Sequence, residues 1–165
     1  MPPRSRSRSC GVELARMRAV VQRVRRARVA IDGVTTAEIA AGLLLFVGVA
    51  NEDGPADVEY IVSKTRDLRI FPDDGGRMNR SVIDAAGALL VVSQFTLNAD
   101  CRKGRRPSFD AAAPGPLARA LYDDVVRGLR ESGLAVSTGT FQADMDVELV
   151  NDGPVTLLLD SRRTF

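Results

Sequence analysis

Short apolar runs rich in β-branched residues, separated by polar positions, dominate the first part of the chain and its end, and they predict strands. The first four runs follow one another closely, which favours an antiparallel meander. The run that begins at Ala88 is apolar until it meets polar residues, which is typical of a buried strand. The predicted strands cover residues 19–24, 28–31, a short run ending at 39, 43–49, 88–95, 136–140, 145–150 and 155–159.

Two other segments carry apolar residues at helical spacing. The first runs from about residue 55 to residue 68 and ends before the turn sequence FPDDGG. The second lies within PGPLARALYDDVVRGLRESG, where Gly133 is the expected C-terminal stop. Because strands are grouped before and after two helices, the pattern predicts an α+β fold with mainly antiparallel sheets rather than a doubly wound one.

The composition is that of a globular protein with one domain: 165 residues, 45% hydrophobic and 27% charged. The net charge of +2 is uneven, because residues 1–16 carry +3 and the remainder −1. This Arg/Ser-rich opening lacks periodicity, and the patterned sequence begins at Met17. We therefore expect residues 1–16 to be a disordered extension, a candidate start-site artefact, and residues 17–165 to be the domain. The alternative is a basic arm that contacts RNA.

The absence of histidine restricts the chemistry most. It excludes Ser-His-Asp triads, Cys-His dyads and histidine metal sites. The two cysteines, Cys10 and Cys101, suggest neither a disulfide framework nor a thiolate metal site, so a reducing cytoplasm is the expected location. The longest apolar run, residues 43–47, cannot span a bilayer. No cofactor and no metal are indicated.

Polar residues at the end of the buried strand form the first candidate site. Ser93, Gln94 and Thr96 place hydroxyls and an amide there, although solvated polar residues often end a strand. Either hydroxyl would need a base to act as a nucleophile. Only Lys64, Lys103 or a carboxylate could supply one, and the spacing selects none of them. A small-ester hydrolase that uses Ser93 or Thr96 stays an alternative.

Two groups of cations form further candidates. CRKGRRPSF holds four cations in five positions around a glycine, a pattern suited to phosphate oxygens, though a solvated loop is as good an explanation. These cations are Arg102, Lys103, Arg105 and Arg106. In the first strand the arginines alternate between faces. If Arg23 points inward and meets no carboxylate, it must donate to backbone carbonyls.

The last candidate is LVNDGPVTLLLD, where an Asp-Gly hairpin signal is followed at once by a proline. An X-Pro bond is cis in about one case in twenty, and a cis proline is usually a positioned feature. Gly153 and Pro154 could together turn carbonyl oxygens away from the sheet. The alternative is that Pro154 begins an edge strand.

Three segments, SQFTLNAD, RRPSF and ADMDVELVNDGPVT, resemble the D-aminoacyl-tRNA deacylase family, and the resemblance runs from Met17 to near the C-terminus. It implies hydrolysis of the ester bond of D-aminoacyl-tRNA, with Gly-tRNA as a second substrate. It also implies a β-β-α layered homodimer, with two helices packed on one side and active sites at the subunit interface. A non-catalytic RNA-binding domain is the alternative function.

The resemblance also assigns roles to residues. Gly153 and Pro154 would form a cis pair inserted into the partner's active site, with carbonyls that receive the α-amino group and exclude L-side chains. Arg23 would fix these carbonyls from behind. The SQxxL motif maps to Ser93, Gln94 and Leu97, with backbone N–H groups near Phe95 and Thr96 stabilising the oxyanion. The 2′-hydroxyl of the terminal adenosine would position or activate the water, and the basic loop would approach the acceptor-stem phosphates.

Overall fold

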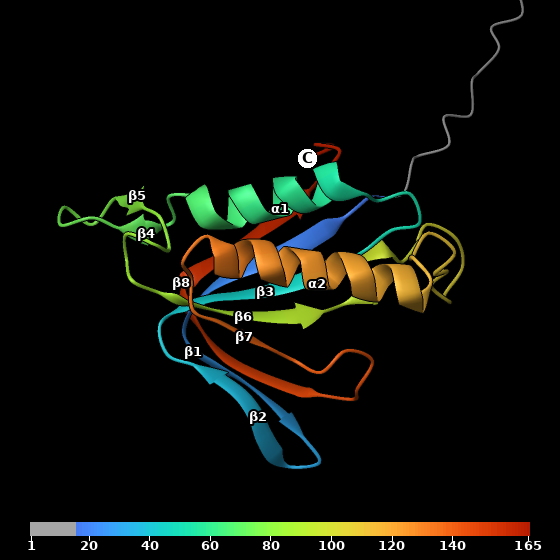
Figure 1. The fold of residues 1–165 in the computed structure, drawn as a ribbon, viewed down its shortest axis with the longest axis horizontal. Coiled ribbons are helices and arrows are strands. Elements are labelled where there is room, and N and C mark those ends of the chain that lie inside the picture. Colours follow the sequence, from blue (N-terminus) through green and yellow to red (C-terminus); the bar gives the residue numbers. More distant parts are fainter. Residues whose placement is uncertain (1–15) are drawn as a thin grey trace, which may run out of the picture.

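A single long strand, β1 (Arg18–Ile31), organises the fold because it pairs with three other strands. The computed structural model describes residues 16–165 (Figure 1). The predicted disorder of the extension therefore lies outside the described residues, apart from residue 16. The other elements are β2 (Val34–Ile39), β3 (Gly42–Gly48), α1 (Pro55–Asp67), β4 (Phe71–Pro72), β5 (Met78–Arg80), β6 (Ala88–Ser93), the 3₁₀ turn η1 (Phe95–Asn98), α2 (Gly115–Glu131), β7 (Val136–Thr138) and β8 (Asp146–Asp160).

The main sheet is mixed. The first half of β1 pairs antiparallel with β3 and its second half with β2, while β8 runs antiparallel along its other side. Beyond β3, the sheet continues through β6 and β7 in parallel register. Each parallel pair is joined by a crossover that contains a helix, α1 or α2, as parallel strands require. Within the main sheet, the expectation of mainly antiparallel pairing thus holds only for the ladders that β1 makes.

Several predicted elements differ from the structure. Both helices occur close to the expected bounds, and Gly133 ends the second with a φ of +87°. The runs 19–24 and 28–31 form one strand instead of two, with an irregularity around Arg25 that lets the strand bend without breaking. The runs 145–150 and 155–159 likewise belong to the single strand β8. The short ribbon of β4 and β5 was not predicted.

Two apolar cores lie on the two faces of the sheet. Both helices cover one face (Figure 1), where Ile61 of α1 and Val125 of α2 are buried together with Leu45 and Val91 of the sheet. On the other face, the second half of β1 and β2 curl over the central strands. Leu90 is fully buried in this second core. The arrangement leaves the ends of β6 and β8 available to build a site.

The second core gives the first prediction. Truncating Leu90 to alanine should lower the free energy of unfolding by about 2–5 kcal/mol, because it removes buried contacts and leaves a cavity. Val34, a strand residue that is 65% exposed, is the matched control, and Val34→Ala should cost less than about 1 kcal/mol. Urea denaturation followed by circular dichroism measures both. Equal losses would mean that the curled strands do not form a core.

Candidate functional site

A pocket of about 500 Å³ opens at the carboxyl end of β6. Its volume falls in the range of small-molecule sites. Its walls come from the β6 end and η1, from the start of α2, and from the segment before β8. The lining residues are Val49, Val92, Ser93, Gln94, Phe95, Ala113, Gly115, Ala118, Phe141, Gln142, Ala143, Asp144, Met145 and Val147.

The turn η1 gives the mouth of this pocket its polar groups. The backbone N–H of Gln94 donates to the carbonyl of Val47 at 2.8 Å, which continues the sheet up to the start of the turn. The first N–H groups of a helical turn, here those of Phe95 and Thr96, have no acceptor within the turn. They are available to a ligand oxygen. Phe95 lines the pocket and Thr96 is the next residue of the same turn, so this pair of donors lies at or beside the pocket.

The hydroxyl of Thr96 is not activated by its neighbour. The side-chain amide of Gln94 donates to Thr96 Oγ1 at 2.6 Å. An amide N–H is a donor and cannot take the hydroxyl proton. This contact therefore gives no support to a Thr96 nucleophile, which would need a base.

The basic loop lies between Asp100 and Ser108. These two residues exchange backbone hydrogen bonds of 2.7 and 3.0 Å, so the loop forms a closed, exposed excursion. Arg102 makes bidentate hydrogen bonds to Asp100, and this guanidinium holds the pKa of the Asp100 carboxyl well below its usual range. Arg105 and Arg106 are exposed and form no ion pair with other residues of the described range 16–165. They are the cations of the loop best able to meet an external anion.

Aromatic packing ties the loop to the pocket. The rings of Phe95 and Phe109 meet edge to face, with centroids 5.1 Å apart. Both rings are substantially exposed, 54% and 40% respectively. The basic loop and the turn η1 therefore present one continuous surface.

Gly153 and Pro154 lie on a protrusion of β8. Thr156 pairs with Gln22 and Asn151 pairs with Val24, so residues 152–155 stand opposite the single residue 23 of β1. Asn151 Nδ2 closes the protrusion by donating to the carbonyls of residues 23 and 155, at 2.8 and 3.0 Å. The Gly-Pro bond is cis, Gly153 has a φ of +125°, and both residues are exposed.

Arg23 lies beneath this protrusion and is 8% exposed. Its guanidinium donates to the carbonyl of Ile70 and, at 3.3 Å, to that of Asp152. The carbonyl that it holds is thus the one immediately before the Gly-Pro pair. The Asp152 carboxylate also pairs with Arg23 at 3.3 Å and with Arg25 at 3.2 Å. The roles of Asp152 and Arg25 were not predicted, because a pairing across a strand irregularity leaves no pattern in the sequence.

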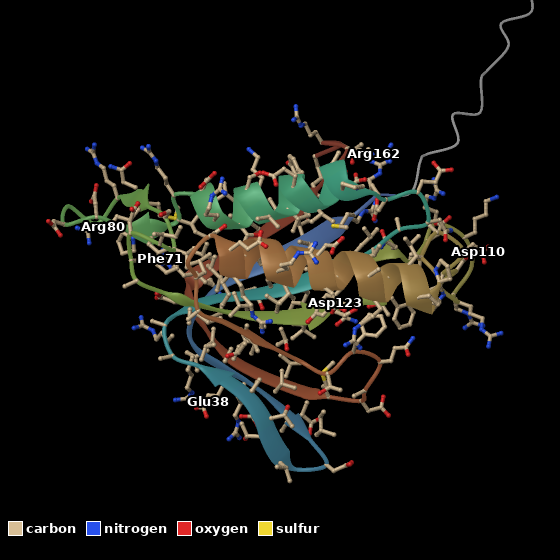
Figure 2. All side chains as sticks on the ribbon, in the orientation of Figure 1. Glu38, Phe71, Arg80, Asp110, Asp123 and Arg162 are labelled. Atoms are coloured by element: carbon tan, nitrogen blue, oxygen red, sulfur yellow. The ribbon has the colours of Figure 1, made fainter. Side chains whose placement is uncertain are left out.

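The Gly-Pro protrusion and the pocket lie far apart within the chain. Residue 23 pairs with residue 43 and through it with residue 89, whereas β6 lines the pocket with residues 92 and 93, the latter four residues farther along the strand. The path from the protrusion to residue 93 covers four residues along the strands and three spacings between neighbouring strands, from β8 to β1, from β1 to β3 and from β3 to β6. Together these steps correspond to a distance of roughly 20 Å. Figure 2 shows the same separation: Phe71, which packs against Arg23, and Asp110, which follows Phe109, lie toward opposite ends of the molecule. Arg23, Gly153 and Pro154 therefore do not join Ser93, Gln94, Phe95 and Thr96 in one site of the same chain.

Two other features bear on what the site can hold. Among the described residues, no group of three or more Asp, Glu, Cys or His side chains is arranged to bind a metal ion. No helix within residues 16–165 has the length and apolar character needed to cross a membrane. The polar side chains that line the pocket are the hydroxyl of Ser93, the amides of Gln94 and Gln142, and the carboxylate of Asp144.

Comparisons with known proteins identify similar chains. A family model described as D-Tyr-tRNA(Tyr) deacylase matches residues 20–160. A D-aminoacyl-tRNA deacylase of Anaeromyxobacter dehalogenans (strain 2CP-C) is 58% identical over 149 residues, which cover 90% of this chain and 100% of the relative. The solved structure of the c-Myc DNA Unwinding Element Binding Protein matches with a TM-score of 0.82 at 38% identity, over 86% of this chain and 97% of that chain. A probable eukaryotic D-amino acid tRNA deacylase matches with a TM-score of 0.73 over 87% of this chain and 98% of that chain, and at 19% identity it supports the fold alone.

The protrusion of β8 gives the second prediction. A Cβ atom at position 153 would lie 2.8 Å from Val155 Cγ2 and 3.1 Å from Arg23 Nη2, on a backbone with positive φ. Gly153→Ala should therefore displace the protrusion and lower the free energy of unfolding by about 1–3 kcal/mol. Amide hydrogen exchange should rise at residues 151–155. Gly54→Ala is the control, because that position is open and has ordinary φ, and it should leave these amides unchanged.

Proposed function

The chain belongs to the D-aminoacyl-tRNA deacylase family, and from this premise we propose which of its residues carry out the hydrolysis. As a member of that family it is a hydrolase that acts on the ester bond of D-aminoacyl-tRNA. The observation that carries the proposal is the pocket at the end of β6, which Phe95 lines, with the N–H groups of Phe95 and Thr96 at the start of the adjoining turn η1. The aminoacylated terminal adenosine would bind there.

The complete active site is proposed to form between two copies of the chain. The exposed Gly-Pro protrusion cannot reach the pocket of its own chain, roughly 20 Å away, so a partner must supply it. An apolar row on the helix-free face supports such a contact. Val20 of β1 lies opposite Leu158 of β8 on one side and Phe46 of β3 on the other. Phe46 in turn lies opposite Val92 of β6, which lines the pocket.

The position of β8 also supports this contact. Within the described sheet β8 pairs only with β1, so it is an edge strand, and Leu158 on it is 60% exposed. An exposed edge with an apolar face is a ready surface for a second chain. A homodimer that covered this face would bring the protrusion of each copy toward the pocket of the other.

The Gly-Pro pair is proposed to select the chirality of the substrate. Its carbonyl oxygens would accept hydrogen bonds from the α-amino group of the bound ester. An L-side chain would then collide with the Gly-Pro backbone, whereas a D-side chain would point toward solvent. Glycine carries no side chain, so glycyl-tRNA would escape this rejection and be a second substrate. Arg23 would hold the base of the filter through the Asp152 carbonyl.

The chemistry is proposed to rely on backbone groups and on the substrate. A water oxygen would attack the ester carbonyl carbon, and the N–H groups of Phe95 and Thr96 would stabilise the resulting oxyanion. The bond to the ribose oxygen would then break, and that oxygen would take up the proton lost by the water. The neighbouring 2′-hydroxyl of the adenosine would position the water, since the chain has no histidine to act as a base. Ser93 and Gln94 would shape the pocket mouth.

The basic loop is proposed to contact the acceptor-stem phosphates. Arg105 and Arg106 would make the main contacts and Lys103 would add charge, whereas Arg102 is already bound to Asp100. Because charged tRNA is used in translation, the expected compartment is the cytoplasm.

A non-catalytic nucleic-acid-binding function is the second candidate. It is favoured by the exposed basic loop and by the name of one similar structure, the c-Myc DNA Unwinding Element Binding Protein. Binding of this kind would depend steeply on salt and would show no chiral preference.

The proposed activity predicts a chiral difference in hydrolysis. The full-length chain should hydrolyse D-Tyr-tRNA and Gly-tRNA and should spare L-Tyr-tRNA by a factor on the order of 100 or more. Release of labelled amino acid from each ester measures this. Inertness toward all three esters would favour the nucleic-acid-binding function, and equal hydrolysis of the D- and L-esters would contradict the filter.

The oxyanion contact makes a separate prediction. Phe95→Pro removes one N–H donor at the first position of η1, where proline is tolerated, and should lower kcat by about 100- to 1000-fold. Gln94, with φ −139° and ψ 83°, is outside the α region that a following proline disfavours. Phe95→Ala is the control, because it removes the ring and keeps the N–H. Similar kcat values for the two variants would show that the ring, rather than the donor, matters.

A further inference from the structure

The carbonyl end of η1 is held by a residue outside the pocket. Arg18, the first residue of β1, donates from Nη1 to the carbonyl of Leu97 at 3.1 Å. The two residues are 79 positions apart in the chain. Arg18 does not line the pocket, and the Leu97 carbonyl is its hydrogen-bond partner on the turn. It can therefore influence the reacting groups only through the position of η1.

Arg18 is itself fixed by a fully buried carboxylate. Its Nε lies 3.5 Å from Asp160 Oδ2, and Asp160 is its Cα partner in the ladder between β1 and β8. The Asp160 side chain is 0% exposed, so it depends on charged and hydrogen-bonded partners. These include the hydroxyl of Thr164 at 3.1 Å and the backbone N–H of Arg162 at 2.9 Å. Arg16 also pairs with it at 3.6 Å.

Gly48 supports the turn η1 from the strand on the other side of Arg18 from Asp160. It is the Cα partner of Arg18 in the ladder between β1 and β3. A Cβ atom at position 48 would lie 2.8 Å from the carbonyl oxygen of Gln94 and 2.9 Å from Leu97 Cβ. The turn therefore packs directly on the backbone at Gly48. Asp160, Arg18 and Gly48 form one row across three strands, and η1 rests on this row.

We propose that Arg18 is a positioning residue for ester hydrolysis: held by Asp160, it fixes η1 so that the N–H groups of Phe95 and Thr96 point at the oxyanion. This inference rests on the proposed function. Oxyanion donors are effective only when they are preorganised at the correct distance, and a displacement of about 1 Å can cost about 100-fold in rate. Ground-state binding of the tRNA, which depends on other surfaces, should change little.

The same two strands supply a matched control. Arg28 and Glu148 are also Cα partners between β1 and β8, and they form a bidentate ion pair at 2.8 and 2.9 Å. This pair lies in the curled part of the sheet, ten residues along β1 from Arg18. Arg28→Met thus removes a cross-strand arginine of the same ladder without touching η1.

The test compares Arg18→Met, Arg18→Lys and Arg28→Met in the full-length chain. Steady-state hydrolysis of D-Tyr-tRNA gives kcat and KM, and amide hydrogen exchange follows residues 95–99. Arg18→Met should lower kcat by about 10- to 100-fold, leave KM within about twofold, and speed exchange in the turn. Arg18→Lys keeps a charge for Asp160 and should recover part of kcat. Arg28→Met should change neither measurement.

Three results would overturn the inference. The first is an unchanged kcat in Arg18→Met with an active wild type. The second is an equal loss in Arg28→Met, which would indicate a general effect of weakening the ladder. The third is a loss confined to KM, which would place Arg18 in substrate binding. A wild-type protein that is inert toward D-Tyr-tRNA would instead reject the proposed function itself.

Discussion

The pairing of β1 with three neighbouring strands is the constraint on which the rest of the structure depends. Its register places residue 23 opposite the Gly-Pro protrusion and residue 18 beside the turn η1, five residues apart along β1. Because strand spacing is nearly fixed, these two functional regions cannot approach each other within one chain. A second copy of the chain is the simplest way to bring them together, and the exposed edge strand β8 gives it a surface to dock on.

The chemistry proposed for the site follows from what the chain lacks. The chain has no histidine, and among the described residues neither the Asp144 carboxylate that lines the pocket nor any other base hydrogen-bonds to the Ser93 or Thr96 hydroxyl. Backbone groups are what remain: N–H donors at the start of η1 and carbonyl acceptors on the β8 protrusion. Backbone groups can act on a substrate only when they are correctly positioned. The side chains most important for the proposed reaction are therefore those that hold this backbone in place. Arg23 does this for the protrusion and Arg18 for the turn.

The sequence predicted those features that have a local pattern. Both helices were predicted from apolar spacing. Arg23 was expected to donate to backbone carbonyls if it met no carboxylate; it donates to the carbonyls of Ile70 and Asp152 and also pairs with the Asp152 carboxylate. The continuity of β8 was not predicted, since Asp-Gly-Pro resembles a turn when the partner strand is unknown. The pocket wall at residues 141–145 and the support of η1 by Arg18 depend on residues far apart in the chain. Only tertiary structure brings these together.

The central claim, a site completed by a partner's Gly-Pro pair, is tested most directly by mixing two defective chains. Gly153→Ala displaces the carbonyls proposed to hold the α-amino group and leaves the pocket intact, whereas Phe95→Pro damages the pocket and leaves these carbonyls intact, so each variant alone should hydrolyse D-Tyr-tRNA poorly. Co-expressed in equal amounts, they should form mixed dimers that each hold one intact site, restoring about a quarter of wild-type D-Tyr-tRNA hydrolysis. If the site lay within a single chain, the mixture would be no more active than the two variants measured separately.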